Sequence, residues 1–401
     1  MRSFRGNVEP FKEHLVKVPR RPFGRPLESG FLTILSFGLF LSIGLRLGLF
    51  DFESVDYREF LSPWYDFIVG HGGFSALQYD FSNYSPLYLY FLTLATHLPL
   101  PKLYAIKLVS ISFDFLLAFF VLLIVRLWHE NRIIWLSSFF AALFAPTVFV
   151  NSALWGQADA TYTSMLVASI YFAIWRRPNL SLFFFSVALS FKLQAIFLFP
   201  LFIVLSLKRR IPIDSFLIIP LTYVASILPA WLAGRPLVEL LVTYPTQAGL
   251  FSDLTLNAPN LYQWLPNDPA LFEKPGTILT ISLVCLLCLI SWRSVVPLDG
   301  DMIVKLALVS TLLVPFTLPH MHERYFFTAD VISIIYAFYR VKRFFVPIIV
   351  GGASLFSYSP FLFRIEPIGL QYLAILMAVA LVVVAADLIR SLYPDSIQLS
   401  T

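Results

Sequence analysis

A succession of long apolar runs, separated by short polar segments, sets the first limit on the fold of this chain. A helix needs about 20 mostly apolar residues to cross the hydrocarbon core of a bilayer. Of the 401 residues, 58% are hydrophobic and only 13% are charged, whereas soluble domains are about 45–50% apolar and about 25% charged. We therefore expect an all-α polytopic membrane protein. The runs that we interpret as spans are 31–50, 103–125, 133–150, 157–175, 211–233, 277–291, 303–318, 325–340, 344–360 and 368–390.

Two further apolar segments decide the topology. Segment 84–98 is short and has a proline near its start, so we expect it to lie at the outer surface without crossing. Segment 180–206 is one long run with Lys192 in its middle, which predicts a hairpin of two short helices with this lysine near its tip. With the basic loop clusters placed in the cytoplasm, the chain has about 12 membrane helices. The predicted parts are a cytoplasmic leader, a transmembrane domain and a cytoplasmic tail, at 1–30, 31–390 and 391–401.

In this topology the mixed polar segments gather on the extracytoplasmic side. Because Lys and Arg alone set the orientation, this gathering is a separate observation, and it predicts one extracytoplasmic site above or between the helices. A prokaryotic chain of this kind would lie in the plasma membrane. The net charge of +5 reflects the orientation of the loops, and we expect no nucleic-acid partner. The outer segments are a large first loop with interfacial helices at 51–102, the stretch 151–159, the Lys192 turn, a second large loop at 234–276, and 320–325.

The segment LPHMHERYFF lies between two apolar runs and carries four ionisable groups, His320, His322, Glu323 and Arg324. Ionisable groups near hydrocarbon are expensive and mark functional sites. Arg324 offers a fork of donors to phosphate oxygens, and Lys192 adds a point charge. The histidines can donate or accept hydrogen bonds, and Glu323 can pair with Arg324 or orient a histidine. A salt-bridge cluster at the interface, and a snorkelling surface lysine at 192, are the alternatives.

Metal binding and redox chemistry are weaker interpretations of the remaining pattern. Two histidines and a carboxylate can bind zinc, but H-x-H-E lacks the i, i+4 spacing of a helical zinc site and no other histidine is an obvious partner. We expect no metal and no other cofactor. Cys285 and Cys288 lie inside an apolar run and are interpreted as small buried hydrophobes.

The first outer loop and the stretch NSALWGQADATYTS hold further candidates. Asp56 follows the first span and is well placed as a base at the membrane surface, although it could be a solvated surface acid. Trp155 offers a flat apolar face to a sugar ring, and Gln157 and Asp159 offer directional hydrogen bonds; a helix N-terminus with an interfacial tryptophan is the alternative. Asp114, inside an apolar run, is expected to brace the bundle. In the second outer loop the candidate acceptor contacts are Asp253, Asn257, Asn260 and Tyr262.

Taken in order, these elements resemble the GT-C glycosyltransferases, which are multi-span enzymes that use polyprenyl-phosphate sugars. VDYREFLSPW followed by SNYSPLYLY is similar to the first outer loop of the branch that contains the endoplasmic-reticulum lipid-linked-oligosaccharide glucosyltransferases and the second mannosyltransferase of GPI-anchor synthesis. NSALWGQADATYTS resembles the W-G-Q-x-D element, FKLQAIFLFP the K-x-Q-x-x-x-L-x-P element, and LPHMHERYFF the M-H-E-R-Y element of prokaryotic relatives. Asn83 and Ser85 stand where the family's D-Y-P-P-L element has an acid and a proline.

The resemblance implies a GT-C-type bundle of about 12 transmembrane helices with a large first extracytoplasmic loop. It implies inverting transfer of a hexose, with mannose favoured, from a polyprenyl-phosphate sugar donor to a glycan or glycolipid acceptor. Membrane lipid would surround the protein as a further partner. Asp56 would deprotonate the acceptor hydroxyl, and the leaving lipid phosphate would need no divalent metal. Donor phosphate would be bound by Lys192, His320, His322 and Arg324. Sugar or acceptor would be bound by Trp64, Trp155, Gln157, Asp159, Gln194 and Glu323.

Two other classes of function stay open at this point. A transporter or flippase of lipid-linked sugars would also need cationic groups in the outer leaflet. It should place ionisable residues on both sides or at mid-membrane and show paired halves with broken helices, whereas no internal repeat is visible. A non-catalytic subunit that only binds lipid phosphate would not need Asp56.

Overall fold

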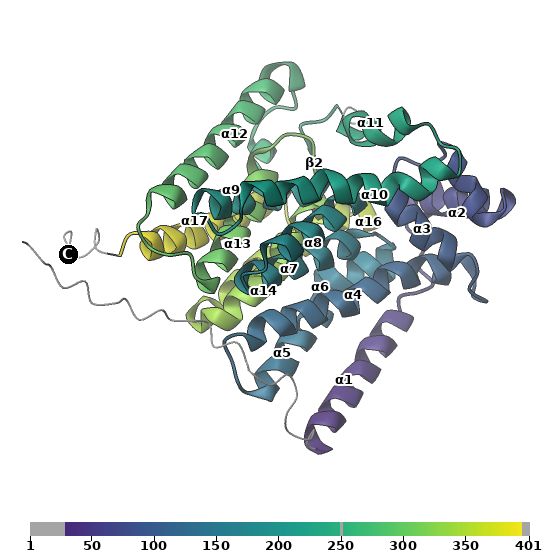
Figure 1. Cartoon of the computed structure of the whole chain (residues 1–401). Helices are drawn as coiled ribbons and strands as arrows, with labels where there is room; N and C mark the ends of the chain where they lie inside the picture. The colour runs from purple at the N-terminus through teal and green to yellow at the C-terminus, as the bar shows by residue number, and fades with distance from the viewer. Residues whose placement is uncertain (1–28, 249–251, 395–401) are drawn as a thin grey trace, which may run out of the picture.

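The structure is a computed structural model that describes residues 29–248 and 252–394 (Figure 1). Most of the expected leader 1–30 and tail 391–401 therefore lies outside the described residues. The α-helices are α1 (Ser29–Leu47), α2 (Ser62–Gly70), α3 (Pro86–Ala95), α4 (Lys102–Arg126), α5 (Arg132–Leu143), α6 (Pro146–Phe149), α7 (Asp159–Ile174), α8 (Pro178–Phe191), α9 (Phe199–Leu207), α10 (Ile218–Leu232), α11 (Leu237–Ala248), α12 (Pro269–Arg293), α13 (Gly300–Thr317), α14 (Phe327–Tyr339), α15 (Phe345–Ser357), α16 (Ser359–Phe363) and α17 (Leu370–Leu392). The shorter elements are η1 (Tyr57–Leu61), η2 (Gly73–Gln78), η3 (Val150–Trp155), η4 (Leu193–Leu198), η5 (Ile213–Leu217), η6 (Leu261–Trp264), η7 (Glu323–Phe326), η8 (Val341–Arg343), and the strands β1 (Thr255–Leu256) and β2 (Met321–His322).

Several of the described helices are long and apolar enough to cross a membrane. Seven meet this measure, namely α1, α4, Ile213–Leu232, α12, α13, Val341–Phe363 and α17. The pair Arg132–Leu143 and Pro146–Trp155, bent by 46°, makes an eighth if it is counted as one span. The expected all-α polytopic membrane fold is thus confirmed. Helices α7, α8 and α14 have only 16, 14 and 13 residues, so the count of about 12 membrane helices stays a prediction.

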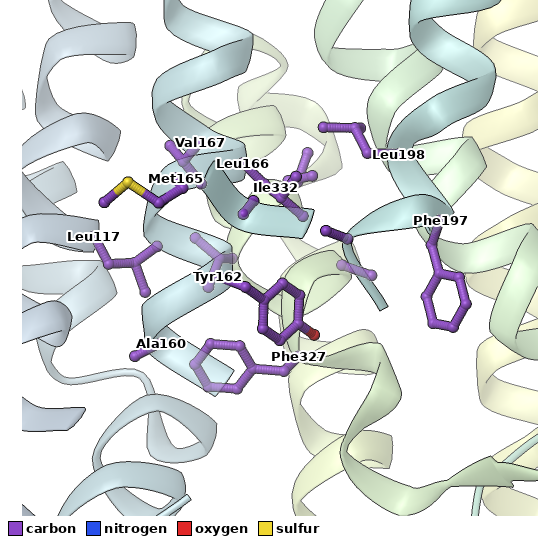
Figure 2. Close-up of a cluster of buried hydrophobic side chains, with 14 of the residues drawn as sticks. Leu117, Ala160, Tyr162, Met165, Leu166, Val167, Phe197, Leu198, Phe327 and Ile332 are labelled. Atoms are coloured by element: carbon purple, nitrogen blue, oxygen red, sulfur yellow. The ribbon is translucent and has the colours of Figure 1, made fainter. Parts of the chain in front are cut away.

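Helix α7 lies at the centre of the bundle, against α4 and α8 (Figure 1). Figure 2 shows Tyr162 and Leu166 of α7 beside Phe327 and Ile332 of α14, and Met165 on the side of Leu117 of α4. Nearly every side chain of α7 is buried, as its apolar character on all sides predicts. Because lipid tails are as apolar as this core, close packing and polar contacts hold such helices together more than exclusion of water does.

The basic loop clusters gather at one end of the bundle. Arg340, after α14, donates to Asp301 at the start of α13 over 2.6 Å. Lys208, after α9, donates to the carbonyl of Ser294, which follows α12. Since α13 begins at this end and α14 returns to it, the segment 318–325 between them lies at the opposite end, away from the basic clusters.

The contacts of Lys192 agree with the expected hairpin at 180–206. Helix α8 ends at Phe191, and Lys192 itself has an extended backbone, with φ −156° and ψ 137°. The chain then returns through η4 and α9. Lys192 pairs with Asp159 at the start of α7, whereas Lys208 lies at the basic end, so the two halves of the run connect opposite ends of the bundle.

Two local expectations concern helix α3 and the two cysteines. Helix α3 packs within the protein, since Tyr88 and Leu92 are fully buried and the helix contacts α4, α8 and α10. That it lies at the outer membrane surface without crossing stays a prediction. An apolar pattern alone does not distinguish contact with lipid from contact with protein. Cys285 and Cys288 are both free thiols, but only Cys288 is buried.

Asp114 braces the bundle, as expected from its position inside an apolar run. Arg46, near the end of α1, donates to Asp114 Oδ2 from Nε and Nη2 over 3.0 and 2.9 Å. Ser152 donates to the same oxygen over 2.6 Å, and all three side chains are buried. The sequence did not identify Arg46 as the partner, although an arginine in an apolar run calls for one.

Candidate functional site

A cavity of about 690 Å³ lies at the end of the bundle opposite the basic clusters. Its walls come from the first loop with η1, the Lys192 turn with η4, the segment around β1, and the connection between α13 and α14. These elements are far apart in the sequence, so the fold collects the predicted site into one place. The predicted residues that line the cavity are Asp56, Trp64, Gln157, Lys192, Gln194, His320, His322, Glu323 and Arg324.

A two-stranded parallel sheet fixes the segment between α11 and η6 beside the cavity. Thr255–Leu256 pairs with Met321–His322, and the amide of His320 donates to the carbonyl of Leu254 over 2.8 Å. Asn257 and His320 both have positive φ, 59° and 62°. Residues other than glycine rarely adopt this conformation, which costs of order 1–3 kcal/mol and persists only where surrounding contacts enforce it. Both strained positions line the cavity.

Asp56 is held through one of its two oxygens. The indole Nε1 of Trp155 donates to Asp56 Oδ2 over 2.8 Å, and Gln157 Nε2 donates to the same oxygen. Gln157 in turn accepts from the hydroxyl of Tyr84 over 3.3 Å, and Ser54 donates to the carbonyl of Trp155 over 2.7 Å. No described residue donates to Asp56 Oδ1. The carboxylate is therefore fixed in position with one oxygen available to a ligand.

Two cations lie in the same cavity, each paired with a carboxylate. Lys192 Nζ donates to Asp159 Oδ1 over 2.5 Å, and Arg324 Nη1 donates to Glu323 Oε1 over 2.8 Å. Arg324 Nε also lies 3.9 Å from Asp159 Oδ2, and its guanidinium sits 5.5 Å from the ring centre of Trp155. The lysine and arginine side chains are only 10% and 13% exposed. Burial of this kind strengthens electrostatic interactions with any charged ligand.

Burial also sets the protonation of the groups around Arg324. The pKa of His322 is lowered by burial and then by the charges of Arg324 and Lys192, so its imidazole is neutral at physiological pH. Burial raises the pKa of Glu323 to about 6, although Arg324 acts in the opposite direction. Burial lowers the pKa of Arg324, but the surrounding carboxylates, with Glu323 first, outweigh it and hold this pKa well above its ordinary value.

Some predicted residues lie beneath the cavity and not in its wall. Trp155 and Asp159 are fully buried and act on a ligand only through the side chains that they hold. Of the second-loop candidates, Asp253 and Asn257 line the cavity. By contrast, Asn260 and Tyr262 are buried. His320 is held by that loop, with Nδ1 at 2.8 Å from the carbonyl oxygen of Asp253 and Nε2 at 3.8 Å from Glu273 Oε2.

Lys107, which was not predicted from the sequence, fixes the chain just before Asp56. Its Nζ donates to the carbonyls of Leu49, Phe50 and Phe52 over 3.1, 2.8 and 2.7 Å. These carbonyls follow the end of α1, where the chain turns into the first loop. A lysine inside the apolar run 103–125 was the available signal, because a buried ammonium needs several acceptors.

Gly156 forms the turn that presents Trp155 and Gln157 to Asp56. Its φ is +83°, a left-handed conformation that glycine adopts without strain. A Cβ there would lie 3.7 Å from a methyl carbon of Leu61. The W-G-Q order is therefore a backbone requirement as well as a set of side chains.

Within residues 29–248 and 252–394, no group of three or more histidine, cysteine, aspartate or glutamate side chains is arranged to hold a metal ion. Comparison with protein-family models and with curated proteins gave no match.

Proposed function

We propose that this protein is an inverting glycosyltransferase of the GT-C type. It would move a hexose, with mannose favoured, from a polyprenyl-phosphate sugar to a lipid-linked or extracytoplasmic glycan acceptor. The observation that carries the proposal is the presence, in one cavity, of a fixed carboxylate with a free oxygen and of two buried cations. Direct displacement at a sugar carbon needs a base on the side of the attacking hydroxyl and positive charge on the side of the leaving phosphate.

Asp56 is the proposed base. Its Oδ1 takes the proton of the acceptor hydroxyl while the oxygen of that hydroxyl forms a bond to the anomeric carbon. The bond between the anomeric carbon and the phosphate oxygen breaks, and its electron pair stays on the phosphate. Because Trp155 and Gln157 hold Oδ2, the base is positioned before the substrate arrives. A positioned general base contributes about 10²–10⁴-fold to such a reaction.

Arg324 and Lys192 are the proposed phosphate-binding cations. Arg324 Nε makes no hydrogen bond to any described residue, so it can donate to a phosphate oxygen alongside the charge of Lys192. Cations fixed in a buried site stabilise developing negative charge without reorganisation during the reaction. The neutral His322 can add one hydrogen bond. We expect no divalent metal in this step.

Apolar side chains line the cavity alongside the charged groups and support a lipid-linked substrate. Phe60, Leu61, Ile196 and Phe197 line its walls, which suits a sugar face and the first isoprene units of a lipid chain. With basic loops in the cytoplasm, the cavity would face the extracytoplasmic side of a bundle of about 12 helices. In a prokaryote this would be the outer face of the plasma membrane.

Transfer and transport can be separated directly. The protein in nanodiscs would receive radiolabelled polyprenyl-phosphate mannose and a mixture of lipid-linked and soluble glycan acceptors, beside empty nanodiscs. We expect label on an acceptor. Movement of the donor across liposomes without any transfer would instead indicate a flippase, and donor binding with neither activity would indicate a non-catalytic subunit.

A further inference from the structure

The charged side chains at the base of the cavity carry an excess negative charge before any substrate binds. The five charged side chains at its base are Asp56, Asp159, Glu323, Lys192 and Arg324. Three carboxylates thus face two cations, which leaves one negative charge in excess. Both cations already contact a carboxylate, over 2.5 and 2.8 Å. A phosphodiester brings a further negative charge, and an unpaired charge in a buried site is strongly unfavourable.

Resting on the proposed function, we propose that Glu323 takes up a proton when the donor phosphate binds to Arg324, and releases it when the product leaves. Arg324 is the only side chain in the described parts of the chain that donates to the Glu323 carboxylate. When Arg324 Nε donates to a phosphate oxygen, the charge of the guanidinium is shared with that anion and no longer compensates this carboxylate alone. The Glu323 side chain is only 1% exposed, so water cannot stabilise its charge next to the phosphate, and protonation removes the excess negative charge.

The other two acids are less suited to take up the proton. Both oxygens of Asp159 accept hydrogen bonds, Oδ1 from Lys192 over 2.5 Å and Oδ2 from Asn151 over 2.8 Å. Asp56 must remain ionised if it is to act as the base. Apart from its own backbone amide, Glu323 is stabilised in its charged form by Arg324 alone, and Arg324 is the residue expected to meet the phosphate.

The surroundings of Glu323 support the same assignment. Besides Arg324 and its own backbone amide, the groups that interact with Glu323 are Asp56 from the first loop, Tyr325 from its own element, and Tyr358 beyond α15. None of these other groups carries a positive charge. Burial raises the pKa of Glu323 to about 6 even with Arg324 beside it, so weaker compensation by the arginine charge moves the pKa further upward.

Proton uptake also offsets the change in charge during the reaction. The donor is a phosphodiester with one negative charge, and the product is a phosphate monoester that can carry two. The acceptor proton goes to Asp56 and the bonding electrons go to the leaving oxygen. A protonated Glu323 donates a hydrogen bond to that phosphate, and the second negative charge of the phosphate then does not lie beside an ionised carboxylate.

Calorimetric titration measures this coupling. The probe is a synthetic mannosyl phosphodiester with a short isoprenyl chain, which does not itself exchange protons near neutral pH. Titrations in two buffers with different ionisation enthalpies give the number of protons bound per donor. At pH 7 we expect about one proton taken up by the wild type, and an affinity that weakens about tenfold per pH unit from pH 7 to 8. Glu323→Gln should bind the probe without proton uptake. Glu59→Gln, an exposed acid outside the cavity, should behave as the wild type.

Each other result decides against the inference. Binding without proton exchange by the wild type overturns it and leaves the proposed function intact. Uptake that persists in Glu323→Gln shows that another group takes the proton. If that variant does not fold, a wild-type affinity that stays constant with pH refutes the coupling by itself. If the wild type does not bind the probe at all, the phosphate site and the proposed function fail together with it.

Discussion

Replacing Asp159 by asparagine tests whether the cations of the cavity are held by a buried acid. Asp159 accepts from Lys192 at Oδ1 and from Asn151 at Oδ2, and Arg324 Nε lies 3.9 Å from Oδ2. An asparagine has the same shape but only one acceptor atom. In either orientation its amide group points at a donor, and Lys192 loses the only charge that it contacts within hydrogen-bond distance among the described residues.

The expected cost follows from burial. Breaking a buried ion pair by removing one partner costs about 3–5 kcal/mol, because the other charge is left uncompensated. Lys102 and Asp66 form a matched control, with a distance of 2.8 Å but side chains that are 32% and 63% exposed. For Asp66→Asn we expect a loss of about 0–1 kcal/mol. The two substitutions are chemically identical, so the difference between their losses in free energy of unfolding measures the effect of burial.

The assay is unfolding by SDS in mixed micelles, followed by circular dichroism, which gives a free energy of unfolding for each variant. We expect Asp159→Asn to lose about 3–5 kcal/mol, and Lys192→Met added to it to recover part of the loss because the stranded charge is gone. Exposed ion pairs typically contribute less than about 1 kcal/mol. If Asp159→Asn, like Asp66→Asn, lowers the free energy of unfolding by less than this, Lys192 is solvated. That result would refute the description of the cavity as a buried charge cluster.

Three further predictions concern the site. The pKa of Glu323 in the folded protein is about 6, above its ordinary 4.5, so between these two pH values the folded state binds a proton more tightly than the unfolded state. The free energy of unfolding should therefore fall by about 2 kcal/mol as pH rises from 4.5 to about 6. The SDS titration of Glu323→Gln should lack this fall. Trp155→Phe removes one charge-assisted hydrogen bond to Asp56, so kcat for transfer should fall about tenfold with the donor KM unchanged, whereas Trp175→Phe at the opposite end of α7 should leave both unchanged. Arg324→Lys keeps the charge and loses the planar fork, so donor binding measured by calorimetry should weaken about tenfold; wild-type affinity in this variant would exclude Arg324 from the phosphate site.

Much of the fold follows from the sequence because apolar length and isolated charges are local signals. Long apolar runs predicted the membrane helices, and Lys192 inside one run predicted the turn that the structure has there. Asp114 marked a buried polar contact for the same reason. The candidate site was also accessible, since an ionisable residue is costly in apolar surroundings and is retained there mainly where it has a partner or a ligand.

The pairings within the site could not be predicted from the sequence. The bond from Trp155 to Asp56 joins residues 99 positions apart, and nothing in the local sequence shows that the indole lies beneath the acid. The position of Asp159 between two cations likewise depends on how α7, α8 and the α13–α14 connection meet. Nor could the sequence show that Tyr88 and Leu92 of α3 contact protein and not lipid.

Whether Asp56 is the base of a transfer reaction is best tested by measuring transfer and donor binding side by side in Asp56→Asn. We predict that transfer of labelled mannose falls by about 10²–10⁴-fold, while the affinity for the mannosyl phosphodiester stays near that of the wild type. Asp66→Asn, which alters an exposed acid of the same loop, should transfer normally. Wild-type rates of transfer by Asp56→Asn would mean that the fixed carboxylate is not the base, and the proposed mechanism would be wrong.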